Sequence, residues 1–130
     1  MYKRLTILYR AIVVLMVFSM SAAVDAQTEL MMAEEPGCIW CARWNAEIAT
    51  AYPKTPEGIA APLRRVDISD TLPEDITLAR RINFTPTFIL LVDGAEVARL
   101  EGYAGEDFFW GLLGKMLDDH GVAFTDDTSG

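Results

Sequence analysis

The first patterned segment of the chain changes from a strand-like to a helix-like spacing of apolar residues. Residues 29–33 form a short apolar run, which is typical of a strand. From Cys38 onward, apolar residues recur every three or four positions, as they do on one face of a helix. That face carries Cys41, Trp44, Ile48 and Tyr52. Pro53 interrupts the pattern and Pro56 and Gly58 follow it, so the helix is expected to end there.

A second strand and a second helix are predicted between residues 63 and 82. Residues 63–68 combine leucine, valine and isoleucine with charged residues, as in a strand. Residues 73–82 have the spacing of a helix, and its inward side chains would be Leu72, Ile76, Ala79 and Ile82. Because the first helix connects two strands, the pair is expected to be parallel.

A hairpin and a closing helix complete the pattern. Residues 88–92 are the most strand-prone stretch, Asp93-Gly94 is a strong hairpin-turn signal, and residues 96–100 alternate as the return strand. Residues 106–119 then form an amphipathic helix. Its apolar side chains are Phe109, Leu112, Leu113, Met116 and Leu117.

These elements predict an α/β fold with a central mixed four-stranded sheet flanked by helices on both faces. The chain has 130 residues, of which 52% are apolar, and this suffices for one domain with a core. We assign residues 27–124 to that domain and residues 125–130 to a polar tail.

The N-terminus has the features of a secretory signal peptide. Lys3, Arg4 and Arg10 precede or flank an apolar run, and small residues surround Ala26. We therefore expect residues 1–26 to be a signal peptide that is cleaved after Ala26, with export to the periplasm. An uncleaved membrane anchor is the alternative, although the run is short for a membrane span.

Charge narrows the range of partners. Removal of residues 1–26 leaves 8 of the 11 basic and 18 of the 19 acidic residues, so the formal net charge changes from −8 to −10. Such a surface repels nucleic acid and anionic lipid, and neither is expected as a partner. It favours a protein partner with a basic or neutral docking patch, and it also serves solubility.

The two cysteines, Cys38 and Cys41, lie at the expected start of the first helix. Their spacing fits a redox dithiol, half of a zinc site, a haem attachment point or a metal carrier. A c-type haem motif needs histidine where Ala42 stands, and His120, the only histidine, is far from the cysteines in sequence. A structural bridge over so short a loop adds little stability. A redox dithiol and a copper(I) carrier, which paired thiolates suit, remain.

The cysteine motif, the later Thr85-Pro86-Thr87 and the order of elements resemble the thioredoxin family. Within that family, Pro36-Gly37-Cys38-Ile39-Trp40-Cys41 is most similar to the small periplasmic thioredoxins of bacterial sulfur-oxidation (Sox) operons, the SoxS type. The resemblance covers residues 28–120. It implies a thioredoxin-like fold and a thiol:disulfide oxidoreductase that needs no metal or other cofactor besides its redox-active disulfide.

The resemblance also implies roles for single residues. In the family, the proline that matches Pro86 is cis and lies against the dithiol, the segment that matches Thr85 offers backbone groups to an extended substrate peptide, and the glycine that matches Gly102 leaves room for that peptide. Trp40, between the cysteines, is a candidate apolar contact for a partner.

Cys38 is the expected nucleophile, because only a thiolate attacks a disulfide and a helix N-terminus favours negative charge. Cysteines at such positions have pKa values of roughly 3.5 to 7.5. Cys41 would then attack the mixed disulfide and release the reduced partner. By resemblance, the partner is the sulfur-carrier protein of thiosulfate oxidation, and a membrane thiol transporter donates the electrons to a monomeric reductant.

Two departures from the family pattern bear on the direction of electron flow. Met32 stands where thioredoxins have a buried aspartate, so Cys41 has no obvious proton acceptor. Glu34 and Glu35 are nearby in sequence, but we interpret them as a solvated acidic loop. Ile39-Trp40 replaces the Gly-Pro of reducing thioredoxins, and this dipeptide tunes the reduction potential in the family. The motif therefore indicates electron transfer without fixing its direction.

Overall fold

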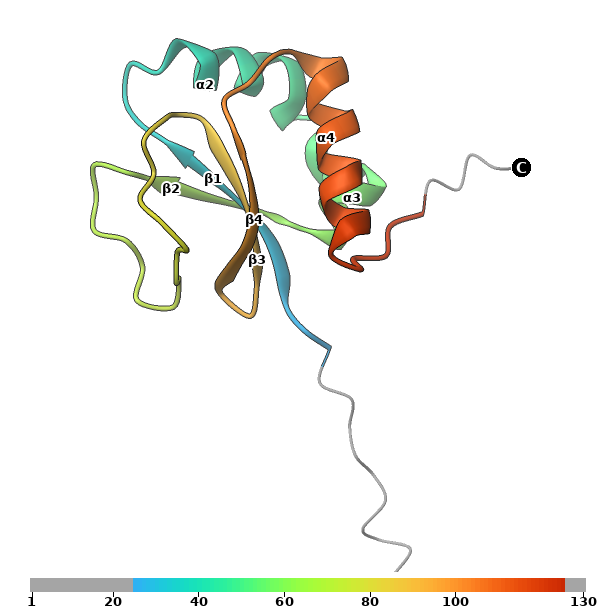
Figure 1. Cartoon of the computed structure of the whole chain (residues 1–130). Helices are drawn as coiled ribbons and strands as arrows, with labels where there is room; N and C mark the ends of the chain where they lie inside the picture. Colours follow the sequence, from blue (N-terminus) through green and yellow to red (C-terminus); the bar gives the residue numbers. More distant parts are fainter. Residues whose placement is uncertain (1–24, 126–130) are drawn as a thin grey trace, which may run out of the picture.

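Four strands form one mixed sheet in the computed structural model, which describes residues 25–125 (Figure 1). They are β1 (Thr28–Glu34), β2 (Leu63–Asp67), β3 (Thr87–Val92) and β4 (Ala95–Glu101), and they lie in the order β2-β1-β3-β4. β1 and β2 are parallel, whereas β3 is antiparallel to both β1 and β4. The predicted mixed four-stranded sheet is therefore confirmed, including its parallel pair and its hairpin.

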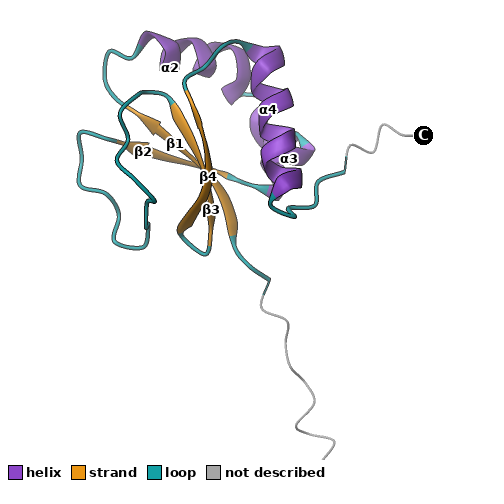
Figure 2. Cartoon of the chain, in the orientation of Figure 1, coloured by secondary structure: helices purple, strands orange, loops and turns teal. Residues whose placement is uncertain are grey.

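The helices of the described residues gather on one side of the sheet (Figures 1 and 2). The first is α2 (Ile39–Trp44), which continues directly as a π-helix (Asn45–Ala49). A 3₁₀-helix (Tyr52–Lys54), α3 (Pro56–Ala60) and α4 (Glu106–Asp119) follow along the chain. The bounds of α4 match the prediction. α3 was not predicted; it forms because Pro56 occupies its first turn, where a proline needs no donor, and the Thr55 hydroxyl accepts the Gly58 N–H at 3.1 Å.

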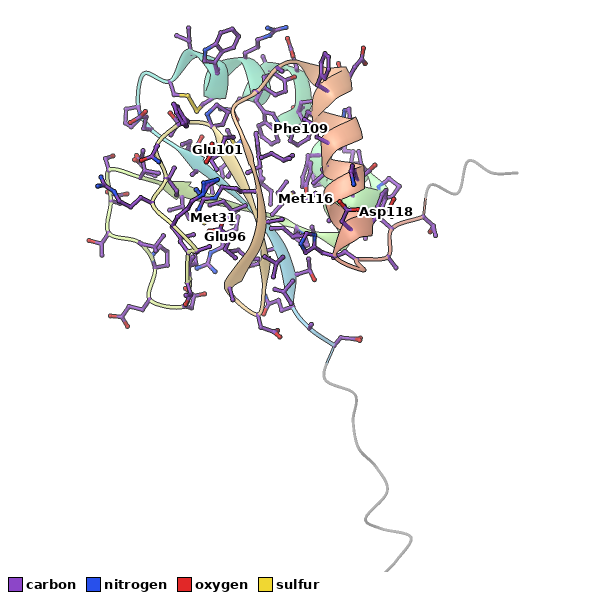
Figure 3. The ribbon with its side chains drawn as sticks, in the orientation of Figure 1. Met31, Glu96, Glu101, Phe109, Met116 and Asp118 are labelled. Carbon is purple, nitrogen blue, oxygen red and sulfur yellow. A yellow bond between two sulfur atoms is a disulfide. The ribbon has the colours of Figure 1, made fainter. Side chains whose placement is uncertain are left out.

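An aromatic core fills the space between these helices and the sheet. Trp44 lies with its ring centroid 5.3 Å from that of Phe88, and Phe109 of α4 is 4.9 Å from Phe88. The predicted inner face of the first helix is confirmed, since Cys41, Trp44, Ile48 and Tyr52 are all buried. Figure 3 shows Phe109 and Met116 pointing from α4 toward the sheet.

The opposite face of the sheet is covered by residues 68–86, which contain no helix. The helix predicted for residues 73–82 is wrong, and helices therefore flank only one face in the described part of the chain. Ile76 packs here with Ile89 and Leu91, joined by partly buried Leu72, Leu78 and Ile82. Thr77 explains why no helix forms, because its N–H donates to Gly94 O and its carbonyl accepts from Glu96 N, both at 2.9 Å. Backbone groups used by the hairpin cannot also close helical turns.

Two sequence predictions fall largely outside the described residues. The signal peptide lies almost wholly in residues 1–24, and most of the polar tail lies in residues 126–130. Between residues 25 and 125, no helix is both long and apolar enough to cross a membrane.

Candidate functional site

The two cysteines form a disulfide where the chain enters α2, visible as the yellow bond in Figure 3. The S–S distance is 2.16 Å and the two Cα atoms are 5.2 Å apart. Cys38 is the N-cap of α2, and its carbonyl accepts the first helical hydrogen bond, from Ala42 N at 3.1 Å. The predicted dithiol at a helix start is thus present as a closed disulfide.

The turn before Cys38 determines how the pair is presented. Gly37 has a φ of 82°, a conformation that side chains other than glycine adopt at a cost. Cys38 N donates to Glu35 O at 3.3 Å, which closes the turn between β1 and α2. The Cys41 N–H then points at Cys38 Sγ, 3.1 Å away. A backbone donor therefore faces the sulfur that the sequence assigns as the nucleophile.

The two sulfur-bearing residues differ in exposure. Cys41 is 3% exposed and belongs to the aromatic core, whereas Cys38 is only partly buried and packs at its margin. Ile39 and Trp40, the residues between them, are exposed, with Trp40 at 48%. Only the Cys38 side of the disulfide is open to a partner, and that side is rimmed by apolar side chains.

The loop at Thr85–Pro86, which ends the segment of residues 68–86 on the opposite face of the sheet, is joined to the turn before Cys38 by a side-chain hydrogen bond. The Thr85–Pro86 peptide is cis. The Thr85 hydroxyl donates to Glu35 Oε1 at 2.7 Å, and Glu35 lies three positions before Cys38. Gly102 N donates to Pro86 O at 2.8 Å, so the chain after β4 reaches the same loop. Three of the predicted contact residues, Thr85, Pro86 and Gly102, are therefore neighbours.

Gly102 has open space beside it. Its φ is 86°, and a Cβ built on it would meet no atom within 4 Å. The conformation requires glycine, and the space on this side of the backbone is unfilled. This geometry fits the expectation that a partner chain approaches here.

A series of side-chain contacts that the sequence prediction missed connects Trp40 to Tyr103, the residue after Gly102. Arg43 lies over the Trp40 ring with its Cζ 5.9 Å from the ring centroid, and its Nε donates to Glu47 Oε1 at 2.9 Å. Glu47 Oε2 accepts the Tyr103 hydroxyl at 2.5 Å. The hydrogen bonds from Arg43 and Tyr103 lower the pKa of Glu47, while burial and the Glu47 bond raise the pKa of Tyr103. The spacing of Arg43 and Glu47, four positions apart on a helix, is a signal that could have revealed this pair.

Arg65 contacts the methionine that stands where thioredoxins have a buried aspartate. Its Nη1 is 3.8 Å from Met32 Sδ and 2.8 Å from Glu34 Oε2, and its Nη2 donates to Asn45 Oδ1 at 2.7 Å. Glu34 ends β1 and pairs with Arg65, so it does not lie in a loop, whereas Glu35 is exposed in the turn, as expected, and accepts the Thr85 hydroxyl. The contacts of Met32 thus include a guanidinium, and no carboxylate replaces the missing aspartate at that position.

Metal ligands are sparse around the disulfide. Within residues 25–125, no group of three or more His, Cys, Asp and Glu side chains is arranged to hold a metal ion. His120 is the C-cap of α4, and its Nδ1 lies 2.9 Å from Met116 O.

Comparison with known proteins identifies one relevant solved structure. The sequence matches no protein-family model and no curated protein. The fold is similar to the crystal structure of the periplasmic thioredoxin SoxS from Paracoccus pantotrophus in its reduced form. The two chains are 52% identical, the match covers 72% of this chain and 98% of that one, and the TM-score is 0.70.

Proposed function

Because the chain belongs to the thioredoxin family and is a thiol:disulfide oxidoreductase related to SoxS, we propose that it acts in the periplasm as a reductant of a partner protein. In this proposal Cys38 is the nucleophile and Cys41 the resolving cysteine. The proposed partner contacts are Trp40, Thr85, Pro86 and Gly102, of which Pro86 is buried in the structure.

The asymmetry of the two cysteines is the observation that carries the proposal. Cys38 is the accessible sulfur and accepts the Cys41 N–H, whereas Cys41 is 3% exposed. A backbone donor aimed at a sulfur stabilises the thiolate after the disulfide is reduced. A buried second thiol is shielded from the partner but lies close enough to Cys38 to attack it next.

The reaction follows from this order of exposure. The Cys38 thiolate attacks one sulfur of the partner disulfide, whose S–S bond breaks, and the second partner sulfur leaves as a thiolate that takes up a proton. Cys41 then loses its proton and attacks Cys38 Sγ, which forms the intramolecular disulfide and expels the partner sulfur that Cys38 had attacked as a thiolate, and this thiolate takes up a proton. Two electrons pass to the partner, and a membrane dithiol transporter is proposed to restore the reduced state.

The partner itself is proposed from the relationship to SoxS. We propose a sulfur-carrier protein whose cysteine must be kept reduced or cleared of a disulfide. The acidic chain favours a partner with a basic or neutral docking surface.

Trapping the mixed disulfide tests the order of attack. The variant Cys41→Ser is expected to accumulate a covalent complex through Cys38, seen on non-reducing gels and released by dithiothreitol, because the resolving thiol is gone. Cys38→Ser is the matched control and should trap far less. If Cys41→Ser traps nothing while the wild type binds copper(I) tightly through both sulfurs, a copper carrier replaces the redox proposal.

The reduction potential of the Cys38–Cys41 pair tests the direction. Equilibration with glutathione buffers gives this value, and a potential near or below that of glutathione supports a reductant. A potential well above it would make the protein an oxidant of dithiols.

Export is proposed with the same function. Residues 1–26 are proposed to be removed after Ala26, which leaves the thioredoxin domain at residues 27–124. The intact mass of the protein purified from a periplasmic extract tests this, because an uncleaved chain would keep the mass of all 130 residues.

A further inference from the structure

The segment that leads into the Thr85–Pro86 loop lacks regular secondary structure. From residue 78 to residue 85 of the described chain, no N–H or C=O group forms a hydrogen bond with another backbone group. The segment nevertheless ends on the loop proposed to receive the partner. Its position must therefore come from side chains.

Two side chains of β4 bind three backbone groups of this segment, and the Thr87 hydroxyl of β3 donates to a fourth, Phe84 O, at 2.7 Å. Glu96 Oε2 accepts the Ala79 N–H at 2.8 Å. Arg99 donates from Nη2 to Arg80 O at 2.9 Å and from Nη1 to Arg81 O at 3.1 Å. We call Glu96 and Arg99 the β4 clamp.

The clamp is itself a buried ion pair. Arg99 Nε lies 2.5 Å from Glu96 Oε1, and the two side chains are 6% and 5% exposed. Each charge is thus held by its partner and by fixed backbone groups, and removing either partner would leave the other buried without compensation. Figure 3 shows Glu96 on the side of β4 that faces the irregular segment.

A β-bulge brings the two clamp residues onto the same face. Residues three positions apart in a regular strand point to opposite faces. Here the register shifts, so that Arg99 pairs with Ile89 and Glu96 pairs with Leu91, while Val97 is the extra residue. Ile89 and Leu91 both belong to the apolar cluster on the face of the sheet that residues 68–86 cover. Because Arg99 and Glu96 pair with these two residues, both clamp side chains lie on that face and reach the segment.

The clamp continues toward the proposed partner surface. Arg80 is paired with Glu101 at 2.8 Å, and Arg99 Nη1 lies 3.7 Å from the same Glu101 oxygen. Glu101 directly precedes Gly102, whose N–H binds Pro86 O. The clamp therefore contacts the segment that leads into Thr85–Pro86 and the residue that precedes Gly102.

We propose that Glu96 and Arg99 are positioning residues that hold the Thr85–Pro86 loop in the geometry that binds the partner chain. This inference rests on the proposed function and adds a determinant of substrate affinity to it. The clamp does not touch the disulfide, so it governs how a protein substrate docks and leaves the sulfur chemistry unchanged.

The decisive experiment compares a protein disulfide with a small disulfide. Arg99→Gln is assayed in two ways. The first assay uses insulin as the protein disulfide and dithiothreitol as the reductant. The second uses the reduced protein alone with the aromatic disulfide DTNB, which can react at Cys38 without an extended chain on the loop. We expect the KM for insulin to rise about tenfold, because a misplaced loop would lose roughly one hydrogen bond to the bound chain, equally in the ground state and in the transition state. The kcat for insulin and the DTNB rate should remain those of the wild type.

Arg64→Gln is the matched control. Arg64 binds Asp75 at 2.7 and 2.8 Å, and Asp75 lies ten positions before Thr85 and outside residues 78–85. Its loss should leave the KM for insulin unchanged. Arg99→Lys keeps the buried positive charge but cannot reach Glu96 and two carbonyls together, so it should give an intermediate KM and serves if Arg99→Gln does not fold.

The outcomes separate the inference from the function on which it rests. An unchanged KM in Arg99→Gln or Arg99→Lys, an equal rise in Arg64→Gln, or a DTNB rate that falls in proportion would each overturn the positioning role. A wild-type protein that reduces neither insulin nor DTNB would instead overturn the proposed function.

Discussion

On one face of the sheet, helices bury Phe88 and Leu90 under a cluster of aromatic rings, whereas on the other face a segment without a helix covers Ile89 and Leu91. On the first face, many apolar contacts each contribute a part of the stability. The second combines a smaller apolar cluster with a few polar bonds from Glu96 and Arg99. Loss of one apolar contact weakens a core, but loss of one polar bond can move a loop.

The difference separates two tasks within one small domain. The helical face carries Cys41 in its core and holds Cys38 at its margin. The irregular face carries the chain into Thr85 and Pro86. Stability and cysteine chemistry are therefore expected to depend on the first face, and partner affinity on the second.

The largest effect is expected from a substitution in the aromatic core. Phe109→Ala should lower the free energy of unfolding by about 3–5 kcal/mol, because it removes a ring that contacts Phe88 and Trp44 and leaves a cavity. Ile82→Ala, on the irregular face, should cost about 1 kcal/mol, because Ile82 is only partly buried. Urea denaturation measures both, and equal losses would contradict the comparison.

A smaller effect on stability, with a separate effect on affinity, is expected at the clamp. Arg99→Met should cost about 3 kcal/mol, since it leaves the Glu96 carboxylate buried and unpaired. The double variant Glu96→Leu/Arg99→Met should regain most of that stability, because no charge remains buried. Its KM for insulin should stay high, because neither side chain can bind the backbone of residues 79–81. Recovery of both properties together would show that the clamp only stabilises the fold.

The smallest expected effect is on the pH dependence of stability in acid. Burial raises the pKa of Glu96, but the hydrogen bonds from Arg99 and the Ala79 N–H outweigh it and leave the pKa below its ordinary value. A carboxyl whose pKa is lowered on folding stabilises the protein above its unfolded pKa of about 4.3, and this contribution disappears as the pH falls through the lowered value. The wild type should therefore lose stability below about pH 4 more steeply than Glu96→Gln. Parallel curves from urea denaturation across that range would contradict this.

The elements that the sequence predicted correctly are those whose pattern is local. The period of α4 and the Asp93-Gly94 turn are visible within a dozen residues, and both were placed well. The segment at residues 73–82 has helical spacing, but Thr77 pairs with residues 94–96 of the hairpin. This pairing with the hairpin outweighed the local preference for a helix. It cannot be predicted from the spacing of apolar residues within the segment.

The candidate site shows the same division. Cys38 and Cys41 stand out by spacing, and Pro86 stands out as a proline before a buried strand. The bond from Thr85 to Glu35 joins residues 50 positions apart. Arg99 would be placed on the wrong face relative to Glu96 unless the bulge at Val97 were known. Such features depend on register, which apolar spacing alone does not determine.

The bulge has a consequence beyond the site, because β4 is an edge strand of the sheet. A long, regular edge strand offers unpaired backbone groups to other chains and invites aggregation. Here the edge is interrupted at Val97 and carries two charged side chains that point inward, and both features discourage another strand from adding. Glu96 and Arg99, which are proposed to position the Thr85–Pro86 loop, are therefore also expected to discourage self-association through this edge.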